Sequence, residues 1–158
     1  MKKNNQTSPG AAGRPAAGEA SHGAPAARNA GPGRLLVAVY AVFALAATAR
    51  AAFQIATKFD HAPLAYLLSA FAAVVYIVAT VGLAKSGPTA YKVSVAAVSI
   101  EMAGVLAVGF FGLLDPAALP EDTVWSGFGA GYGYVPLLLP ILGLWWLWRH
   151  RADARTAG

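Results

Sequence analysis

Four stretches of this chain are apolar over a length that matches the thickness of a lipid bilayer. They cover about residues 35–57, 64–83, 91–114 and 124–149. At ~1.5 Å per residue, a helix of about twenty residues crosses the ~30 Å hydrocarbon layer. Backbone N–H and C=O groups in hydrocarbon must be satisfied within the chain, which favours helices as the spanning elements. The sequence therefore predicts an all-α, polytopic membrane protein that forms a four-helix transmembrane bundle.

The composition agrees with lipid as the solvent for most of the chain. Of the 158 residues, 57% are hydrophobic and 12% are charged, whereas a soluble domain carries about 25% charged residues. The chain has no cysteine, so disulfides, thiolate metal sites and cysteine nucleophiles are excluded. The histidines, His22, His61 and His150, lie outside the apolar stretches. We therefore expect no metal site, no haem ligand within the membrane and no cofactor.

The two ends of the chain are predicted to be tails. Residues 1–34 contain nine Ala, six Gly and four Pro, with no bulky apolar residue after Met1. Such a segment buries too little surface to offset the entropy lost on ordering, so we expect a disordered tail. Residues 150–158 form a short basic tail.

Positive charges are distributed unequally between the two sides of the predicted bundle. Ten Lys and Arg residues fall on the side that carries both termini, while the opposite side has Lys58 and several carboxylates. The positive-inside rule then places both termini in the cytoplasm of a bacterium whose inner membrane holds the protein. The net charge of +5 reflects this topology and does not indicate nucleic-acid binding. The expected partners are the lipid bilayer and either other membrane proteins or further copies of this chain.

Two charged residues, Arg50 and Glu101, lie inside the apolar stretches. Each costs about 2.5–3.5 kcal/mol on insertion scales at a helix centre, so both are candidate site residues. One possibility is an ion pair between them across the bundle, because their depths along ideal helices differ by ~7 Å, which is near the reach of a long side chain. Alternatively, Glu101 is neutral and either hydrogen-bonded to Ser or Tyr or able to carry a proton, and Arg50 extends toward the outer interface beside Gln54. Tyr76 is a further polar candidate, on the inward stripe of the second span. Helical spacing also places Tyr40 on the inward face of the first span, and Ser94, Ala97 and Val108 on the face of the third span that carries Glu101.

The start of the fourth span is rich in glycine and admits two interpretations. Gly127 with Gly131, and Gly129 with Gly133, form small-xxx-small pairs that allow close packing of helices. Alternatively, this segment is partly unwound, since each glycine costs ~1 kcal/mol of helix propensity. Prolines at positions 136 and 140 are predicted to kink the helix that follows.

Several segments resemble those of a known group of proteins. They are residues 50–59 (RAAFQIATKF), Glu101, residues 125–132 (WSGFGAGY), residues 135–137 (VPL) and residues 142–145 (LGLW). Over about residues 35–150 the chain resembles small four-span integral membrane proteins of actinobacteria, which are mostly of unknown function. The resemblance implies the fold and no activity. Small multidrug transporters also have four spans and one membrane glutamate, but theirs is in the first span and this one is in the third.

Two functions are consistent with these features. The first is a non-enzymatic accessory or assembly component of the membrane, held together by Arg50, Gln54, Glu101 and the glycines of the fourth span. The second is a small proton-coupled carrier with Glu101 as the titrating group. No nucleophile motif and no paired carboxylates occur in the spans. An enzyme would have to use Asp60, His61 and the acidic loop that follows the third span.

Overall fold

The computed structural model describes residues 31–152, and all regular structure in that range is helical. The long helices are α1 (Pro32–Lys58), α2 (Pro63–Ala84), α3 (Pro88–Leu114) and α4 (Val135–Arg149). Short 3-10 helices lie between them: η2 (Phe59–His61), η3 (Pro116–Ala118) and η4 (Ser126–Tyr132). The predicted all-α bundle is confirmed.

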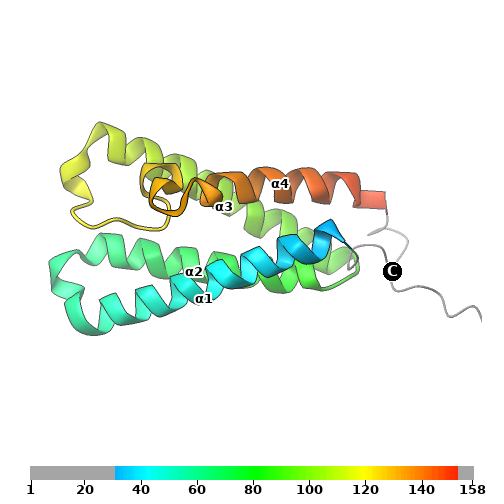
Figure 1. Cartoon of the computed structure of the whole chain (residues 1–158), viewed down its shortest axis with the longest axis horizontal. Coiled ribbons are helices and arrows are strands. Elements are labelled where there is room, and N and C mark those ends of the chain that lie inside the picture. Colours follow the sequence, from blue (N-terminus) through cyan, green and yellow to red (C-terminus); the bar gives the residue numbers. More distant parts are fainter. Residues whose placement is uncertain (1–30, 153–158) are drawn as a thin grey trace, which may run out of the picture.

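The long helices run side by side along the length of the molecule (Figure 1). α1 packs on α2, α2 on α3, and α3 on both α4 and η4, while the contact between α1 and α4 is small. The described ends of the chain and the turn between α2 and α3 lie at one end of the bundle, which we call the terminal end. The other end, here called the distal end, carries η2, η3 and the segment that leads into η4.

Prolines and glycines set the boundaries of these helices. α1, α2 and α3 each begin with a proline, whose fixed φ suits the first turn and whose missing N–H would have no partner there. Gly87 precedes α3 with a φ of 106°, a backbone conformation that favours glycine. This glycine therefore allows the tight turn that reverses the chain between α2 and α3.

The interior of the bundle combines small residues with a few large side chains. Alanines are frequent among the buried residues of α1 and α2, and small side chains let two membrane helices approach closely. The largest side chains buried in the bundle include Tyr40, Tyr66, Tyr76, Leu83, Glu101, Trp125 and Leu147. One buried carboxyl group thus lies among aromatic and aliphatic side chains.

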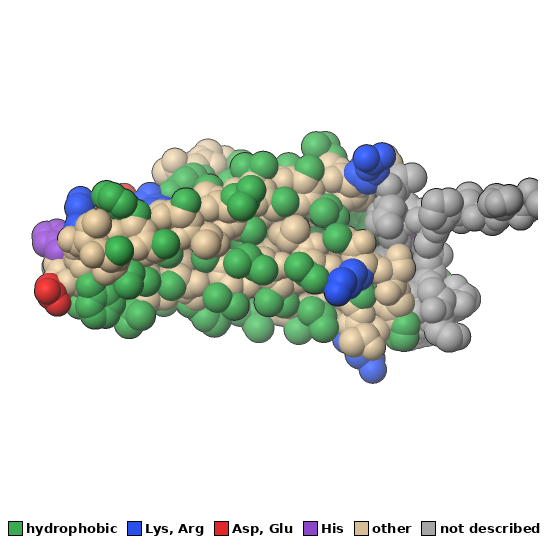
Figure 2. All heavy atoms as spheres, turned by 90° about the horizontal axis from the view of Figure 1, so that it is seen from below, with side chains coloured by type: hydrophobic (Ala, Val, Ile, Leu, Met, Phe, Trp, Pro, Cys, Tyr) green, Lys and Arg blue, Asp and Glu red, His purple; other side chains and the backbone are tan. Residues whose placement is uncertain are grey.

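Large apolar side chains cover the outside of the bundle along its length, and Lys and Arg side chains lie at its two ends (Figure 2). Leu45 and Leu114, for example, are 74% and 84% exposed. A continuous apolar exterior is typical of a surface that faces lipid. The segment Pro32–His61, α2 and α3 are each long and apolar enough to cross a membrane. The structure therefore agrees with a multi-pass membrane protein.

The fourth predicted span, 124–149, is not one continuous helix. η4 and α4 meet at an angle of 102° and provide a fourth crossing only if the bent pair is counted as one span. α4 alone has 15 residues and is ~22 Å long, which is less than the ~30 Å hydrocarbon layer. The bend lies at Gly133 and Tyr134, which both have left-handed φ values of 62° and 61°. It precedes Pro136, which occupies the first turn of α4, so the proline kink predicted there is wrong.

α1, α2 and α3 cover the apolar stretches 35–57, 64–83 and 91–114 and begin one to three residues before them. α1 begins at Pro32, within the range 1–34 predicted as a tail, because Pro32 and the preceding Gly31 suit the start of a helix. The rest of the predicted N-terminal tail (residues 1–30) and residues 153–158 lie outside the described range.

Candidate functional site

Glu101 is the middle residue of α3 and has no exposed surface. Ser94, Ala97 and Val108, which share its helix face by sequence spacing, are also buried. The predicted inward face of α3 is therefore the face that packs in the bundle. At this position the carboxyl group is as far from either end of the helix as α3 allows.

A tyrosine of α1 holds one oxygen of this carboxyl group. The Tyr40 hydroxyl donates a hydrogen bond of 2.6 Å to Glu101 Oε2, across 61 residues of sequence. Gly143 of α4 leaves room for this hydroxyl, since a Cβ at that position would lie 3.2 Å from the Tyr40 oxygen. One hydrogen bond thus connects α1 to α3 through the centre of the bundle.

Tyr76 of α2 and Trp125 complete a cluster around Glu101. The rings of Tyr40 and Tyr76 lie 6.2 Å apart, and the Trp125 ring lies against Gly104, three residues after Glu101 on α3. We call these four residues (Tyr40, Tyr76, Glu101 and Trp125) the polar core. They come from three helices and from the segment that leads into η4, so the polar core joins most of the fold at one point.

The polar core is only partly satisfied by direct hydrogen bonds. Glu101 Oε1, the Tyr76 hydroxyl and Trp125 Nε1 are buried and have no hydrogen-bond partner among the described residues. Their chemistry is complementary, because the indole N–H can donate to the tyrosine oxygen and the tyrosine O–H can donate to the carboxyl oxygen. Small shifts of these side chains would connect the three groups in one chain of donors and acceptors.

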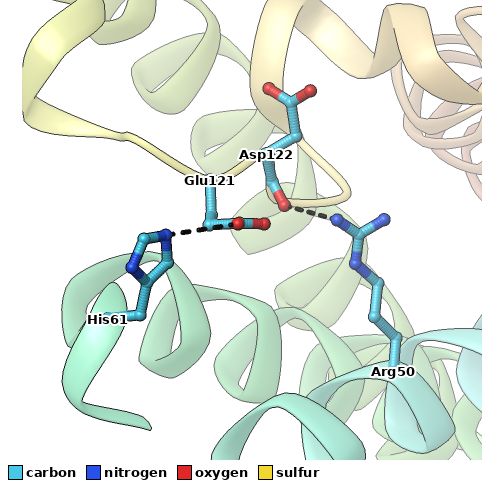
Figure 3. Close-up of polar contacts among 4 residues, drawn as sticks. All are labelled: Arg50, His61, Glu121 and Asp122. Carbon is cyan, nitrogen blue, oxygen red and sulfur yellow. Dashed lines mark hydrogen bonds and ion pairs between the residues drawn. The ribbon is translucent and has the colours of Figure 1, made fainter. Parts of the chain in front are cut away.

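Arg50 does not pair with Glu101. Its guanidinium donates one hydrogen bond of 2.6 Å to the Tyr132 hydroxyl and another of 2.8 Å to the main-chain carbonyl of Asp122 (Figure 3). The alternative in which Arg50 extends toward the outer interface is the one that the structure supports. The physical reason is reach, because the distal loop passes close to α1 and brings oxygen acceptors to the guanidinium.

The other predicted polar residue, Gln54, lies one turn beyond Arg50 on α1 and is buried. Its Oε1 atom has no hydrogen-bond partner within residues 31–152. The structure therefore divides the predicted site residues in two. Glu101 and Tyr76 meet in the polar core, whereas Arg50 and Gln54 belong to the distal half of α1.

The helical interpretation of Gly127, Gly129, Gly131 and Gly133 is wrong. Gly127, Gly129 and Gly133 have positive φ values of 55°, 80° and 62°, which only an unwound segment contains. Glycine adopts these angles at little cost but weakens a helix, so the dense run favours a turn. Among these four glycines the tight contact is at Gly129, where a Cβ would lie 2.7 Å from the Pro136 ring.

Close packing instead depends on two glycines of α3. A Cβ at Gly104 would lie 2.5 Å from the Trp125 ring, and one at Gly109 would lie 2.4 Å from the Phe128 ring. These distances are shorter than any real contact of a Cβ atom. Each glycine therefore makes a space on α3 that an aromatic ring of the distal segment fills.

Tyr40, Trp125 and Tyr132 were not predicted as neighbours of the charged residues. Tyr40 was placed on the inward face of the first span, so its side was predicted but its partner was not. A hydroxyl-bearing aromatic on an inward face is the signal that could have been used, since membrane carboxyl groups need donors. No comparable signal marks Tyr132, because its position depends on how the glycine segment folds.

The chemical groups at these sites are few. Within the described range no three residues of the His, Cys, Asp and Glu types lie close enough to hold a metal ion. No protein-family model, curated protein or solved structure matches the chain.

Proposed function

We propose that this chain is a non-enzymatic, multi-pass component of a bacterial membrane that acts by assembling with other membrane proteins or with further copies of itself. The observation that carries the proposal is the polar core. Its groups face one another inside the bundle, and Glu101 has no exposed surface. In lipid, such interhelical hydrogen bonds stabilise helix association, since there is no hydrophobic drive between helices. A structural use of the buried carboxyl group accounts for its position without any ligand.

A second candidate, a small proton-coupled carrier, draws on a different observation. Glu101 Oε1 and the Tyr76 hydroxyl have no hydrogen-bond partner among the residues that the structure describes. Intramembrane carboxyl groups of this kind carry protons in transporters. A carrier would also need a water path to Glu101, and this requirement separates the two functions.

The two functions are distinguished by reconstitution in liposomes that enclose a pH-sensitive dye. For a structural component, we expect proton flux equal to that of empty liposomes for the wild type and for Glu101→Gln. The Gln variant keeps an acceptor for Tyr40 and should accumulate in the membrane like the wild type. Glu101→Leu removes that acceptor and should accumulate less, because a buried hydroxyl left unpaired costs about 1–3 kcal/mol.

If the wild type shows a pH-dependent proton flux that Glu101→Gln abolishes, the structural proposal is contradicted and the carrier is supported. The assembly itself is tested by purification from native membranes in a mild detergent. We expect a stoichiometric membrane protein or a homo-oligomer in the eluate. A monomer that elutes alone would contradict the proposal.

We also propose that the terminal end faces the cytoplasm. The distribution of charge supports this orientation, because Arg34, Lys85, Lys92 and Arg149 lie at or near helix ends on that side, as the positive-inside rule requires. The absence of cysteine makes single-cysteine labelling direct. With a membrane-impermeant maleimide on intact cells, we expect Asp60→Cys to be labelled and Ser86→Cys to be protected. The reverse pattern would invert the topology.

A further inference from the structure

The distal end contains a recess of about 330 Å³ beside Arg50. Its lining includes Arg50 and Tyr132, the acidic residue Asp122, and small residues of η4 such as Ala130 and Gly131. A Cβ at Gly131 would meet no atom within 4 Å, so there is open space beside this residue. The recess is thus large enough for a small polar group, and a cation borders it.

The charge of Arg50 has no counter-ion in the described part of the chain. Both of its hydrogen bonds go to uncharged acceptors, the Tyr132 hydroxyl and the Asp122 carbonyl. The Asp122 carboxylate points away from the guanidinium (Figure 3), and Glu121 Oε1 lies 3.6 Å from His61 Nε2. Partial burial of a guanidinium costs desolvation free energy, and neutral oxygens compensate this cost less than a counter-ion would.

Hydrogen-bond donors remain available on both sides of this contact. A guanidinium has five N–H groups, and two of its nitrogens are engaged. Tyr132 accepts the bond from Arg50, so its own O–H is free to donate. Arginine matches the geometry of phosphate oxygens through its planar set of donors. The free donors therefore suit an oxyanion.

The depth of Arg50 favours a phosphate group. The middle of α1 (Pro32–Lys58) is residue 45, so the Arg50 backbone lies ~7 Å from it toward the distal end. Its side chain reaches farther, to the distal loop, which brings the charge near the edge of the hydrocarbon layer at ~15 Å from the midplane. Lipid phosphates lie just beyond that edge. Because acidic side chains also occur at this end, a singly charged phosphodiester fits better than a doubly charged phosphate.

We infer that the recess beside Arg50 binds a phosphate group, held by the free donors of the guanidinium and by the Tyr132 hydroxyl. The group can come from the headgroup of a lipid in the distal leaflet or from a soluble phosphate. This inference does not depend on whether the protein acts as an assembly component or as a carrier.

The test is native mass spectrometry of the full chain, purified in detergent and mixed with phosphatidylglycerol or with a neutral glycolipid that lacks phosphate. We expect the wild type to retain phosphatidylglycerol in preference, and Arg50→Gln to weaken this retention by about tenfold or more, because charge-assisted hydrogen bonds are lost. Lys58→Gln is the matched control. It removes the same charge from the same helix, but Lys58 lines a different recess, so retention should stay at the wild-type level.

Tyr132→Phe is the second variant, since Arg50→Gln also removes a bond to the distal loop and can disturb the fold. It should weaken retention several-fold, whereas Tyr134→Phe, two residues along the chain and exposed, should not. A parallel titration with inorganic phosphate identifies the source. If the wild type binds inorganic phosphate and both variants lose that binding, the ligand is a soluble phosphate. Equal retention of the two lipids with no effect of phosphate, or retention unchanged by both variants, overturns the inference.

Discussion

Trp125→Ala is expected to produce the largest loss of stability of any single substitution considered for this protein. Trp125 is 1% exposed, its ring lies against Gly104 of α3 and it makes an edge-on contact with Phe71 of α2 at 6.0 Å. Truncation of a buried aromatic costs about 3–5 kcal/mol. For a protein of this size the thermal midpoint in detergent should fall by about 10 °C.

Trp148→Ala is the matched control. Trp148 is 60% exposed and lies near the terminal end of α4, under the guanidinium of Arg151. Its removal should change the midpoint by less than about 3 °C, because it leaves no cavity. Trp125→Phe keeps one aromatic ring but loses the indole N–H and part of the ring volume, so it should cost less than Trp125→Ala. Equal midpoints for Trp125→Ala and Trp148→Ala would show that the distal segment is not fixed by Trp125.

Helical periodicity predicted which faces of the helices lie inside. Ser94 and Ala97 on α3, and Tyr76 on α2, were placed inward by spacing alone, and all three are buried. The free-energy cost of exposing a carboxyl group to lipid likewise predicted that Glu101 faces the interior of the bundle. The inward face of a membrane helix follows from its own sequence and from lipid as the solvent, so it can be predicted without knowing the neighbouring helices.

The partners of the two charged residues could not be predicted in the same way. Depth along ideal, parallel helices put Arg50 and Glu101 within reach of each other, yet their contacts are with Tyr132 and Tyr40. Those contacts join residues 82 and 61 positions apart, so they depend on helix tilt and on the path of the distal loop. The hydrophobic periodicity of a single span predicts neither the tilt of a helix nor the path of a loop.

The glycine-rich segment shows a related limit. Glycine spacing at positions 127–133 fits both a helix-packing face and a run of left-handed turns, and local propensity separates the two by only a few kcal/mol. The choice is made by tertiary contacts. Phe128 packs against Gly109 and makes an edge-on contact with Phe110 at 5.1 Å, which a straight fourth helix would not allow.

Gly104→Ala should destabilise the protein, and Gly112→Ala in the same helix should not. A methyl group at Gly104 would lie within 3.0 Å of three atoms of the Trp125 ring, whereas one at Gly112 would meet nothing within 4 Å. In an open position, Gly→Ala in a helix gains about 1 kcal/mol, so Gly112→Ala should raise the thermal midpoint slightly. At Gly104 the overpacking costs about 1–3 kcal/mol or more, which outweighs that gain.

The two glycine variants should therefore shift the midpoint in opposite directions, and a second substitution identifies the cause. Trp125→Leu removes the ring that the new methyl group would strike, so Gly104→Ala should cost less in the Trp125→Leu background than in the wild type. The difference between the two backgrounds is the coupling energy of the pair, which we expect to exceed about 1 kcal/mol. Strictly additive effects would mean that the Gly104 methyl group is accommodated without moving Trp125, and the close packing of α3 against the distal segment would then have to be revised.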